Sequence, residues 1–354
     1  MKPIKIGTQA IGDGYPCFVI AEISANHNQD FNLAKRLVKL AKESGADAVK
    51  FQTYTPETMT LDCDNDYFRI KEGPWKGQTL YELYKKAYTP WKWFKGLKEF
   101  ADEIGITFIS TPFDKTAVDL LETIDVPAYK IASFELNDIP LISYIASKGK
   151  PVILSTGMGS LADIELAVNT IREKGNEKII LLKCTSDYPA DPKDMNLVSM
   201  QSLSQTFGVM CGLSDHSLFN EVSLAAVCWG AKIIEKHFTD DEKRPGPDSA
   251  FSISSAKLSE LIKSIHVVEN AKGKSSYSGD NGERKNYIFR RSLFVVKDID
   301  KGERFTELNV RSIRPHFGLE PKHYMSILNK KSLCKIKAGT PLTWSMVELD
   351  LPQK

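Results

Sequence analysis

Residues 209–238, VMCGLSDHSLFNEVSLAAVCWGAKIIEKHF, contain the pattern that decides the fold class. Two apolar runs, 209–215 and 233–238, lie on either side of a stretch at 219–229 that predicts a helix. Both runs are apolar along most of their length rather than at every second position, which is typical of parallel strands covered on both faces. The segment therefore predicts a strand, a helix and a second strand parallel to the first.

The same alternation of apolar runs and helical signals extends back to the start of the chain. Leu33, Leu37 and Leu40 recur at helical spacing, Thr89 before a proline predicts a helix N-cap, and Ser160 predicts another. The further apolar runs are 18–22, 48–52, 107–111, 129–133, 152–156 and 179–186. The further predicted helices are 31–45, 89–105, 115–123, 139–148, 160–175, 193–206 and 254–270.

Eight strand–helix units favour an α/β fold in which the sheet closes into a (β/α)8 TIM barrel and no strand is left at an edge. An open doubly wound sheet is the alternative, and it normally carries a glycine-rich turn after its first strand. The stretch EISANHNQD (22–30), which follows the first apolar run, contains no glycine. We therefore expect the barrel.

A change in composition after residue 271 predicts a second domain. We place the barrel at residues 1–271 and a linker at 272–288, because KGKSSYSGDNGERKNY is polar and rich in glycine and serine. Residues 289–354 contain short apolar runs separated by DKG and KAGTP, which predicts a small β-rich domain. Such a domain is too small to build a large catalytic core of its own.

The charge balance and the apolar pattern exclude several classes of protein. There are 47 Lys and Arg against 45 Asp and Glu, so the net charge of +2 gives no global surface for nucleic acid. No run approaches the roughly 18 apolar residues of a membrane span, and the first residues lack the pattern of a secretory signal. The six cysteines form no CxxC pair, which favours reduced thiols and a cytoplasmic protein.

Polar and ionisable side chains occur at the end of every predicted strand. In TIM barrels these ends meet at one mouth, where the active site forms. Lys50 and Lys130 lie within strands, and a buried lysine costs desolvation unless it is paired. With nearby hydroxyl groups they would suit a ligand that carries phosphate and carboxylate; the alternative is a solvated rim. The hydroxyl residues are Thr111, Ser133, Ser155, Ser186 and Ser214.

His216 and His237 end the last two predicted strands, which are neighbours in a barrel. Two imidazoles with open positions for water and a substrate oxygen would suit Mn²⁺, Zn²⁺ or Fe²⁺. The alternative is two structural, hydrogen-bonded histidines. His27, in the first loop, could be a ligand, an acid–base group or a donor that stabilises the loop. Asp248, on the turn PGPDS, could meet a substrate hydroxyl or amide beside the mouth.

The second loop, residues 53–90, is longer than most loops in compact domains. It includes a predicted short helix at TLYELYKKA (79–87), and we expect it to overhang the mouth of the barrel. Its aromatic residues fit either local packing or a platform for a sugar; they include Tyr67, Phe68, Trp75 and Tyr81.

At these strand ends the sequence resembles the sialic acid synthase family, whose members condense phosphoenolpyruvate with an amino-sugar. The matching stretches are FVIAEISANHN, GADAVKFQTYTP, FISTPFD, YKIASFE, LSTGM, LLKCTSDYP, GLSDHS, IIEKHF and GPDS, and the C-terminal domain resembles the antifreeze-like (SAF) domain of that family. GPWKGQTLYELYKKAYTPWKW, SFELNDIPLI and NVRSIRPHFGLEPKHY look closest to its pseudaminic acid synthase branch.

This branch implies a 2,4-diacetamido-2,4,6-trideoxy-L-altrose as the sugar substrate. N-acetylneuraminate and legionaminate synthases, which use N-acetylmannosamine or another diacetamido-trideoxy hexose, are near relatives and remain the alternative.

The resemblance implies a role for each residue of the site. His216 and His237 would bind a divalent metal, with Mn²⁺ expected first and Mg²⁺ or Co²⁺ as alternatives. Arg314 would reach a partner subunit's sugar in a domain-swapped homodimer. Phosphoenolpyruvate would be held by Lys50, Thr111, Lys130, Ser133, Ser155, Ser186 and Ser214. Glu22, Gln52, Tyr188 and Asp248 would face the sugar, and Glu22, Glu135, Lys50 and Lys130 would form the catalytic group.

Three positions depart from the family pattern. Ser186 stands where relatives often have asparagine, Glu242 stands where an arginine is expected, and RPHFG (314–318) replaces a glycine–tyrosine pair. Two other functions remain open. One is a Schiff-base aldolase with Lys130 or Lys50 as the nucleophile, whose adduct borohydride would trap. The other is a non-catalytic sugar-binding barrel, which would tolerate the substitution His237→Ala.

Overall fold

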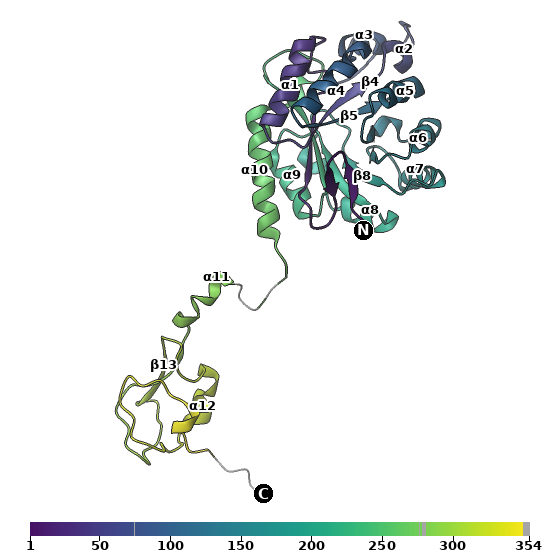
Figure 1. The fold of residues 1–354 in the computed structure, drawn as a ribbon. Coiled ribbons are helices and arrows are strands. Elements are labelled where there is room, and N and C mark those ends of the chain that lie inside the picture. The colour runs from purple at the N-terminus through teal and green to yellow at the C-terminus, as the bar shows by residue number, and fades with distance from the viewer. Residues whose placement is uncertain (74, 276, 278–280, 350–354) are drawn as a thin grey trace. The chain divides into compact units, whose positions relative to one another are not determined.

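The structure, a computed structural model, describes residues 1–73, 75–275, 277 and 281–349 and divides into two compact units, Met1–Gly273 and Lys274–Lys354. In the first unit eight parallel strands form a closed sheet, because the last strand pairs with both the one before it and the first (Figure 1). The predicted TIM barrel is confirmed. The strands are β3 (Phe18–Glu22), β4 (Ala48–Thr53), β5 (Thr107–Pro112), β6 (Tyr129–Ile131), β7 (Val152–Ser155), β8 (Ile179–Cys184), β9 (Met210–Asp215) and β10 (Ile233–Thr239).

Helices surround the sheet, and the apolar faces of strands and helices form one large outer core (Figure 1). This arrangement explains why the strand sequences are apolar at nearly every position: one face meets the helices and the other fills the barrel. The barrel helices are α1 (Phe31–Glu43), α4 (Phe94–Glu103), α5 (Lys115–Thr123), α6 (Ile139–Ala146), α7 (Leu161–Glu173), α8 (Ser199–Phe207), α9 (Asn220–Cys228) and α10 (Ser255–Lys272).

Two predicted helix starts have different outcomes. Ser160 caps α7 as predicted, since its hydroxyl accepts from the Asp163 backbone N–H and the Asp163 carboxylate accepts from Ser160 N–H. Thr89 is not an N-cap: its hydroxyl contacts His27 Nε2 at 2.9 Å, and the helix begins only after a 3₁₀ turn, η1 (Trp91–Trp93). Similar 3₁₀ turns, η2 (Ser133–Glu135) and η3 (Pro192–Asp194), replace the end of the fourth predicted strand, 129–133, and the start of the predicted helix 193–206.

An N-terminal hairpin, β1 (Ile4–Ile6) and β2 (Gln9–Ile11), was not predicted. Its isoleucines belong to a second apolar core together with Phe18, Met210 and Ile233, which lie at the beginnings of β3, β9 and β10. The hairpin therefore plugs the amino-terminal end of the barrel. We therefore expect a substrate to enter at the carboxyl-terminal ends of the strands.

The loops at the open end carry short elements of their own. The second loop contains α2 (Pro56–Met59) and α3 (Leu80–Ala87), and the last loop contains η4 (Ser249–Phe251) and a short strand, β11 (Ile253–Ser254), which pairs with β10. The short helix predicted at 79–87 is thus present as α3.

The second unit has its own small core and little regular structure. The strands β12 (Ser292–Val295) and β13 (Val310–Ile313) form an antiparallel pair, and isolated bridges such as Ile299 with Ile336 extend the β character that the sequence predicted. Its helical elements are α11 (Asn281–Arg284), η5 (Tyr287–Phe289), η6 (Pro321–His323), α12 (Tyr324–Ile327) and η7 (Trp344–Met346). Across the described residues no helix has the length and apolar composition to cross a membrane.

Candidate active site

The alternation of side chains along β9 and β10 separates an inner set of polar groups from an outer set. Ser214 and Glu235 face the barrel interior, where the serine hydroxyl donates to Glu235 Oε1 at 3.0 Å. Asp215 and Lys236 face outward and form a fully buried ion pair of 2.7 Å. Ser223 on α9 donates to the same aspartate at 2.6 Å, so this pair joins the strands to the helix layer.

The outer ion pair supports the segment that carries His216, because Asp215 Oδ1 also accepts from Ser217 N–H at 2.9 Å. We predict that Asp215→Ala lowers the free energy of unfolding by about 3–5 kcal/mol, since it leaves the Lys236 ammonium buried without its partner. Chemical denaturation measures the change. Asp102→Ala, which removes a partly exposed ion pair with Lys98 on α4, is the matched control and should cost less than about 1 kcal/mol. Equal losses in the two variants would contradict the prediction.

Inside the barrel two lysines and two glutamates form a buried charge cluster. Lys50 Nζ lies 2.7 Å from Glu22 Oε2 and 3.7 Å from Glu235 Oε1, and Lys130 Nζ lies 3.8 Å from the same oxygen of Glu235. All four side chains are at most 5% exposed. Each ammonium is therefore paired, which meets the condition under which a lysine can be buried.

Sequence reasoning assigned no role to Glu235, although it is the carboxylate that both lysines share. It lies two residues before His237 on the same face of β10, and this spacing was the available signal. Burial alone raises the pKa of Glu235, but the charges of Lys130 and Lys50 outweigh it and lower the pKa overall. The carboxylate therefore stays ionised between the two ammonium groups.

Two other carboxyl groups titrate near neutral pH. Burial raises the pKa of Glu22 to about 7, against the opposing charge of Lys50. Burial also raises the pKa of Glu135 to about 7, with Lys130 opposing the shift. A group with such a pKa can both donate and accept a proton at neutral pH, which suits an acid–base role.

The predicted hydroxyl residues lie either beside the two lysines or around Gly157. Thr111 Oγ1 accepts from Lys50 Nζ at 3.1 Å, and Ser155 Oγ accepts from Lys130 Nζ at 2.7 Å. Ser133 Oγ accepts from Gly157 N–H at 3.1 Å. A Cβ atom at Gly157 would overlap the hydroxyls of both Ser133 and Ser186, so these two groups converge on one glycine. Together with Ser214, all five hydroxyl residues lie in the lysine cluster or in the cradle around Gly157.

His216 and His237 lie side by side at the mouth, with ring centres 5.3 Å apart. Two imidazoles that share one tetrahedral ion, with metal–nitrogen bonds of about 2.1 Å, also place their centres about 5 Å apart. His216 Nδ1 contacts the Thr185 carbonyl at 2.9 Å, which leaves Nε2 for a ligand. His237 Nδ1 is buried and has no hydrogen-bond partner among the described residues.

The protonation state of His237 also suits a metal ligand. Burial, followed by the charge of His216, holds the pKa of His237 well below its usual value, so this ring is neutral as a ligand must be. Burial also acts to lower the pKa of His216, but the effect of Cys184 outweighs it and raises that pKa overall, so an ion would displace a proton from that ring. No group of three or more histidine, cysteine or acidic side chains gathers around an ion site in the described part of the chain. The two imidazoles thus fit a divalent ion whose remaining ligands would be water and substrate.

The residues predicted to face the sugar lie around this pair. Gln52 Nε2 donates to Ser24 Oγ at 2.7 Å and to Glu22 Oε1 at 3.3 Å. The Tyr188 ring packs 4.4 Å from His216, and Asp248 is buried with its Oδ2 accepting from the Ala25 backbone. Arg314 follows β13 in the second unit.

His27 is a loop-stabilising group, which resolves the three alternatives left by the sequence. Its Nδ1 accepts from the Gln29 backbone N–H at 3.0 Å, so Nε2 carries the hydrogen and donates to Thr89 Oγ1. Burial lowers the pKa of His27 to about 4, and the ring stays neutral at physiological pH.

The departure at Glu242 is explained by contacts outside the site. Its carboxylate accepts from the Ser254 backbone N–H at 2.9 Å and from Lys257 Nζ at 3.0 Å, next to the start of α10. The nearby Arg244 forms a two-pronged ion pair with Asp240.

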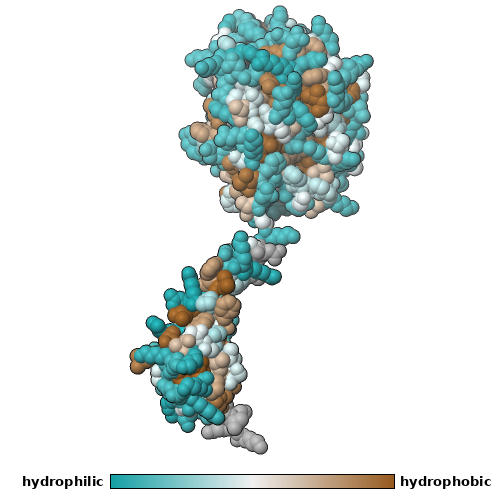
Figure 2. Space-filling view, turned by 60° about the vertical axis from the view of Figure 1, so that its left-hand side comes forward, coloured by the Kyte–Doolittle hydropathy of each residue, from teal (hydrophilic) through white to brown (hydrophobic). Residues whose placement is uncertain are grey.

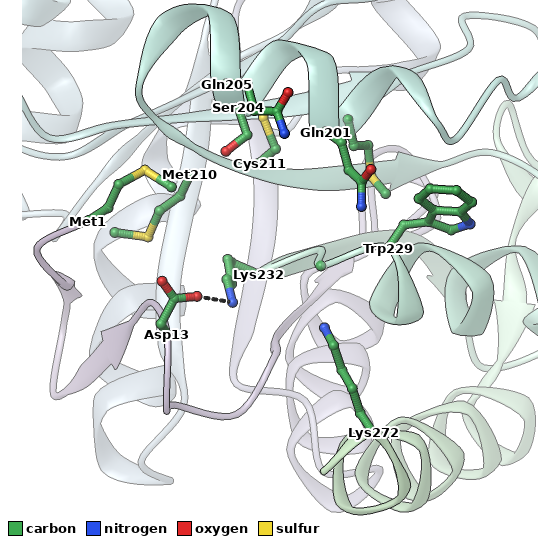
Figure 3. A pocket seen from close by; sticks show the side chains of 12 residues that line it. Met1, Asp13, Gln201, Ser204, Gln205, Met210, Cys211, Trp229, Lys232 and Lys272 are labelled. Atoms are coloured by element: carbon green, nitrogen blue, oxygen red, sulfur yellow. Dashed lines mark ion pairs between the residues drawn. The ribbon is translucent and has the colours of Figure 1, made fainter. Parts of the chain in front are cut away.

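A cavity of 310 Å³ lies at the amino-terminal ends of the strands, and Figure 3 shows the side chains that line it. It is lined in part by Met210 and Lys232, at the beginnings of β9 and β10, and by Lys272 at the end of α10. Lys232 Nζ is paired with Asp13 at 2.6 Å. The strands β9 and β10 separate this cavity from His216 and His237, which lie at their other ends.

A comparison of the sequence with known families identifies the family to which the chain belongs. The sequence profile of the NeuB family matches residues 37–277, and that of the SAF domain matches residues 290–348. The chain belongs to the NeuB family and ends in a SAF domain.

Among its relatives, the pseudaminic acid synthase of Helicobacter pylori is 44% identical over 95% of this chain and 99% of that protein. The N,N'-diacetyllegionaminic acid synthase of Legionella pneumophila is 37% identical over 97% of this chain and 98% of that protein. The crystal structure of an N-acetylneuraminic acid synthetase from Leptospira borgpetersenii, in complex with citrate, is 34% identical with a TM-score of 0.73 and covers 80% of this chain and 95% of that one.

Proposed function

We propose that this protein is a pseudaminic acid synthase, which condenses phosphoenolpyruvate with 2,4-diacetamido-2,4,6-trideoxy-L-altrose and releases phosphate. The observation that carries the proposal is the cluster of Lys50 and Lys130 around Glu235, two residues below His237, in a chain of the NeuB family. The higher identity with the pseudaminic than with the legionaminic acid synthase supports the choice of sugar.

The lysines and hydroxyls would bind the enol phosphate. Lys50 and Lys130 offer the charge, and Thr111, Ser155 and the pair at Gly157 offer directed donors for phosphate and carboxylate oxygens. Held there, C3 of phosphoenolpyruvate faces the aldehyde that lies toward the imidazoles. Fixing two reactants in this way removes much of the entropic part of the barrier.

The two carboxyl groups with a pKa of about 7 would move the protons. After C3 bonds to the aldehyde carbon, water adds at C2 and phosphate leaves with cleavage of the C2–O bond. Glu22 or Glu135 can take the proton of that water and return a proton to the former aldehyde oxygen. Gln52, which donates to Glu22, would keep that carboxyl oriented toward the sugar.

A divalent ion bound by His216 and His237, with Mn²⁺ preferred over Mg²⁺ or Co²⁺, would supply Lewis-acid polarisation of the aldehyde. The support is the paired geometry of the rings and the Nδ1 of His237, which has no hydrogen-bond partner in the part of the chain that the structure describes. Thr185 would fix the orientation of His216 through its carbonyl.

We also propose a cytoplasmic, domain-swapped homodimer in which Arg314 contacts the acetamido group of the sugar in the partner's barrel. Large apolar side chains are exposed on both units, and Figure 2 shows brown patches on the second unit. Phe134 and Met158, in the loops after β6 and β7, are 59% and 66% exposed, and Phe317, near Arg314, is 65% exposed. Burial of such side chains against a second copy would stabilise the dimer.

A panel of condensations tests the proposed function. The protein is incubated with phosphoenolpyruvate and, in turn, with the L-altrose substrate, another diacetamido-trideoxy hexose and N-acetylmannosamine, and released phosphate is measured with and without a chelator. We expect release with the L-altrose substrate at a kcat/KM at least about tenfold above the others, and loss of release with chelator. Preference for N-acetylmannosamine, or no release with any sugar, would overturn the assignment.

A further inference from the structure

Aromatic rings form a wall above the two imidazoles, and one of these rings comes from the long second loop. The Trp75 ring centre lies 6.2 Å from Tyr188 and 6.4 Å from Phe251. Those two rings in turn contact the imidazoles, Tyr188 at 4.4 Å from His216 and Phe251 at 4.8 Å from His237. Trp75 is thus one ring farther from the reacting end of the site.

A hydrogen bond fixes the orientation of the Trp75 indole. Its Nε1–H donates to the Pro247 carbonyl at 2.9 Å, and Pro247 precedes Asp248, which belongs to the site. This bond ties the second loop to the loop after β10. Because it uses the single polar group of the indole, the ring presents only apolar surface to its other neighbours.

Trp75 also borders an outer cavity of 670 Å³. The cavity is lined further by Leu83 and Lys86 of α3 and by the turn at Pro245 and Gly246. The indole therefore contacts the aromatic wall as well as this space. Removing the indole would extend this cavity up to the rings of Tyr188 and Phe251.

We propose that Trp75 determines specificity for a sugar with a methyl group at C6, an inference that rests on the function proposed above. The aldehyde carbon C1 must lie by the imidazoles to react, so C6, at the other end of the open-chain sugar, reaches the rings farther out. A methyl group there gains from burial against Trp75. A hydroxyl group would lose hydrogen bonds to water, because the indole offers it no partner.

The experiment compares two substrates that differ only at C6, 2,4-diacetamido-2,4,6-trideoxy-L-altrose and its 6-hydroxy analogue. For the wild type we expect a kcat/KM about 10- to 100-fold higher with the 6-deoxy sugar. Trp75→Ala should reduce this preference to about threefold or less, through a raised KM for the 6-deoxy sugar and an improved kcat/KM for the analogue.

Two further variants separate polarity from the loss of the loop contact. Trp75→Phe keeps an apolar ring and loses the bond to Pro247, so it should retain most of the preference. Trp75→His keeps a ring with an N–H donor but makes that ring polar. This variant should lose most of the preference for the 6-deoxy sugar. Tyr67→Ala is the control, because Tyr67 lies in the same loop and is 91% exposed.

The possible failures are distinguishable. If the wild type condenses neither sugar, the proposed function fails. If the wild type is active but shows no preference, or if Trp75→Ala and Trp75→His keep the wild-type preference, the role of Trp75 is wrong while the function stands. The same conclusion follows if Tyr67→Ala changes the preference as much as Trp75→Ala does.

Discussion

Substitution of His237 by alanine is expected to lower the kcat for phosphate release by about a thousandfold or more. The reason is that the remaining imidazole, His216, is a single ligand and cannot retain the ion. Lewis-acid polarisation of a carbonyl contributes several kcal/mol. Each 1.4 kcal/mol of lost transition-state stabilisation lowers the rate about tenfold. The measurement is phosphate release from phosphoenolpyruvate and the L-altrose substrate, with calorimetric titration of Mn²⁺ as a readout that does not depend on activity.

Two comparisons make this prediction specific. The double variant His216→Ala, His237→Ala should be no slower than either single variant, because both rings are expected to serve one ion and their effects should not add. His266→Ala, on α10 with its side chain 56% exposed, should leave both rate and Mn²⁺ binding unchanged. A His237→Ala protein that keeps a tenth of the wild-type rate would show that the pair is structural.

Substitution of Lys130 by methionine should lower kcat/KM for phosphoenolpyruvate by about 100- to 1000-fold, the usual cost of removing one buried donor to a developing or bound anion. Lys130 is fully buried and bonded to Ser155, and its partner Glu235 would then compete with the substrate for Lys50. Burial lowers the pKa of Lys130, so its positive charge depends on the surrounding acceptors.

The binding step can be followed without turnover. Phosphoenolpyruvate should raise the Tm of the wild type and leave that of Lys130→Met nearly unchanged, since a ligand stabilises a protein only to the extent that it binds. Lys150→Met removes an ion-paired lysine that contacts Glu122 and Asp125 away from the site, and should keep the wild-type response. A borohydride-trapped adduct on Lys130 would instead support the Schiff-base aldolase. An unchanged KM in Lys130→Met would contradict the binding role.

The strand ends were predictable from two features of the sequence, the apolar runs and the alternation of side chains along each run. Apolar runs mark where strands lie, and alternation along each run selects the inner residues, so Lys50 and Lys130 could be placed in one interior before any coordinates were known. The pairing partners were not predictable in the same way. Glu235 serves both lysines only because β10 closes the ring between β9 and β3, and closure brings together residues far apart in sequence.

Other features depend on contacts that local patterns do not encode. Thr89 has the sequence of an N-cap, but its hydroxyl forms a hydrogen bond with the buried imidazole of His27 in the first loop instead of capping the helix. The N-terminal hairpin has only three residues in each strand, which is too short for a clear sequence pattern. Its isoleucines are buried only because they pack into the end of the closed barrel. Whether His216 and His237 bind an ion in solution stays a prediction for the titration above.

Because β1 and β2 pack into the amino-terminal end of the barrel, we expect the reactants to enter and leave at the carboxyl-terminal ends of the strands. The cluster of Lys50 and Lys130 is the deepest part of that route, and the aromatic wall lies nearer to its entrance. A sugar that bound first would therefore block the access of phosphoenolpyruvate to the lysines. Steady-state kinetics should accordingly follow a compulsory order, with the enol phosphate entering ahead of the sugar.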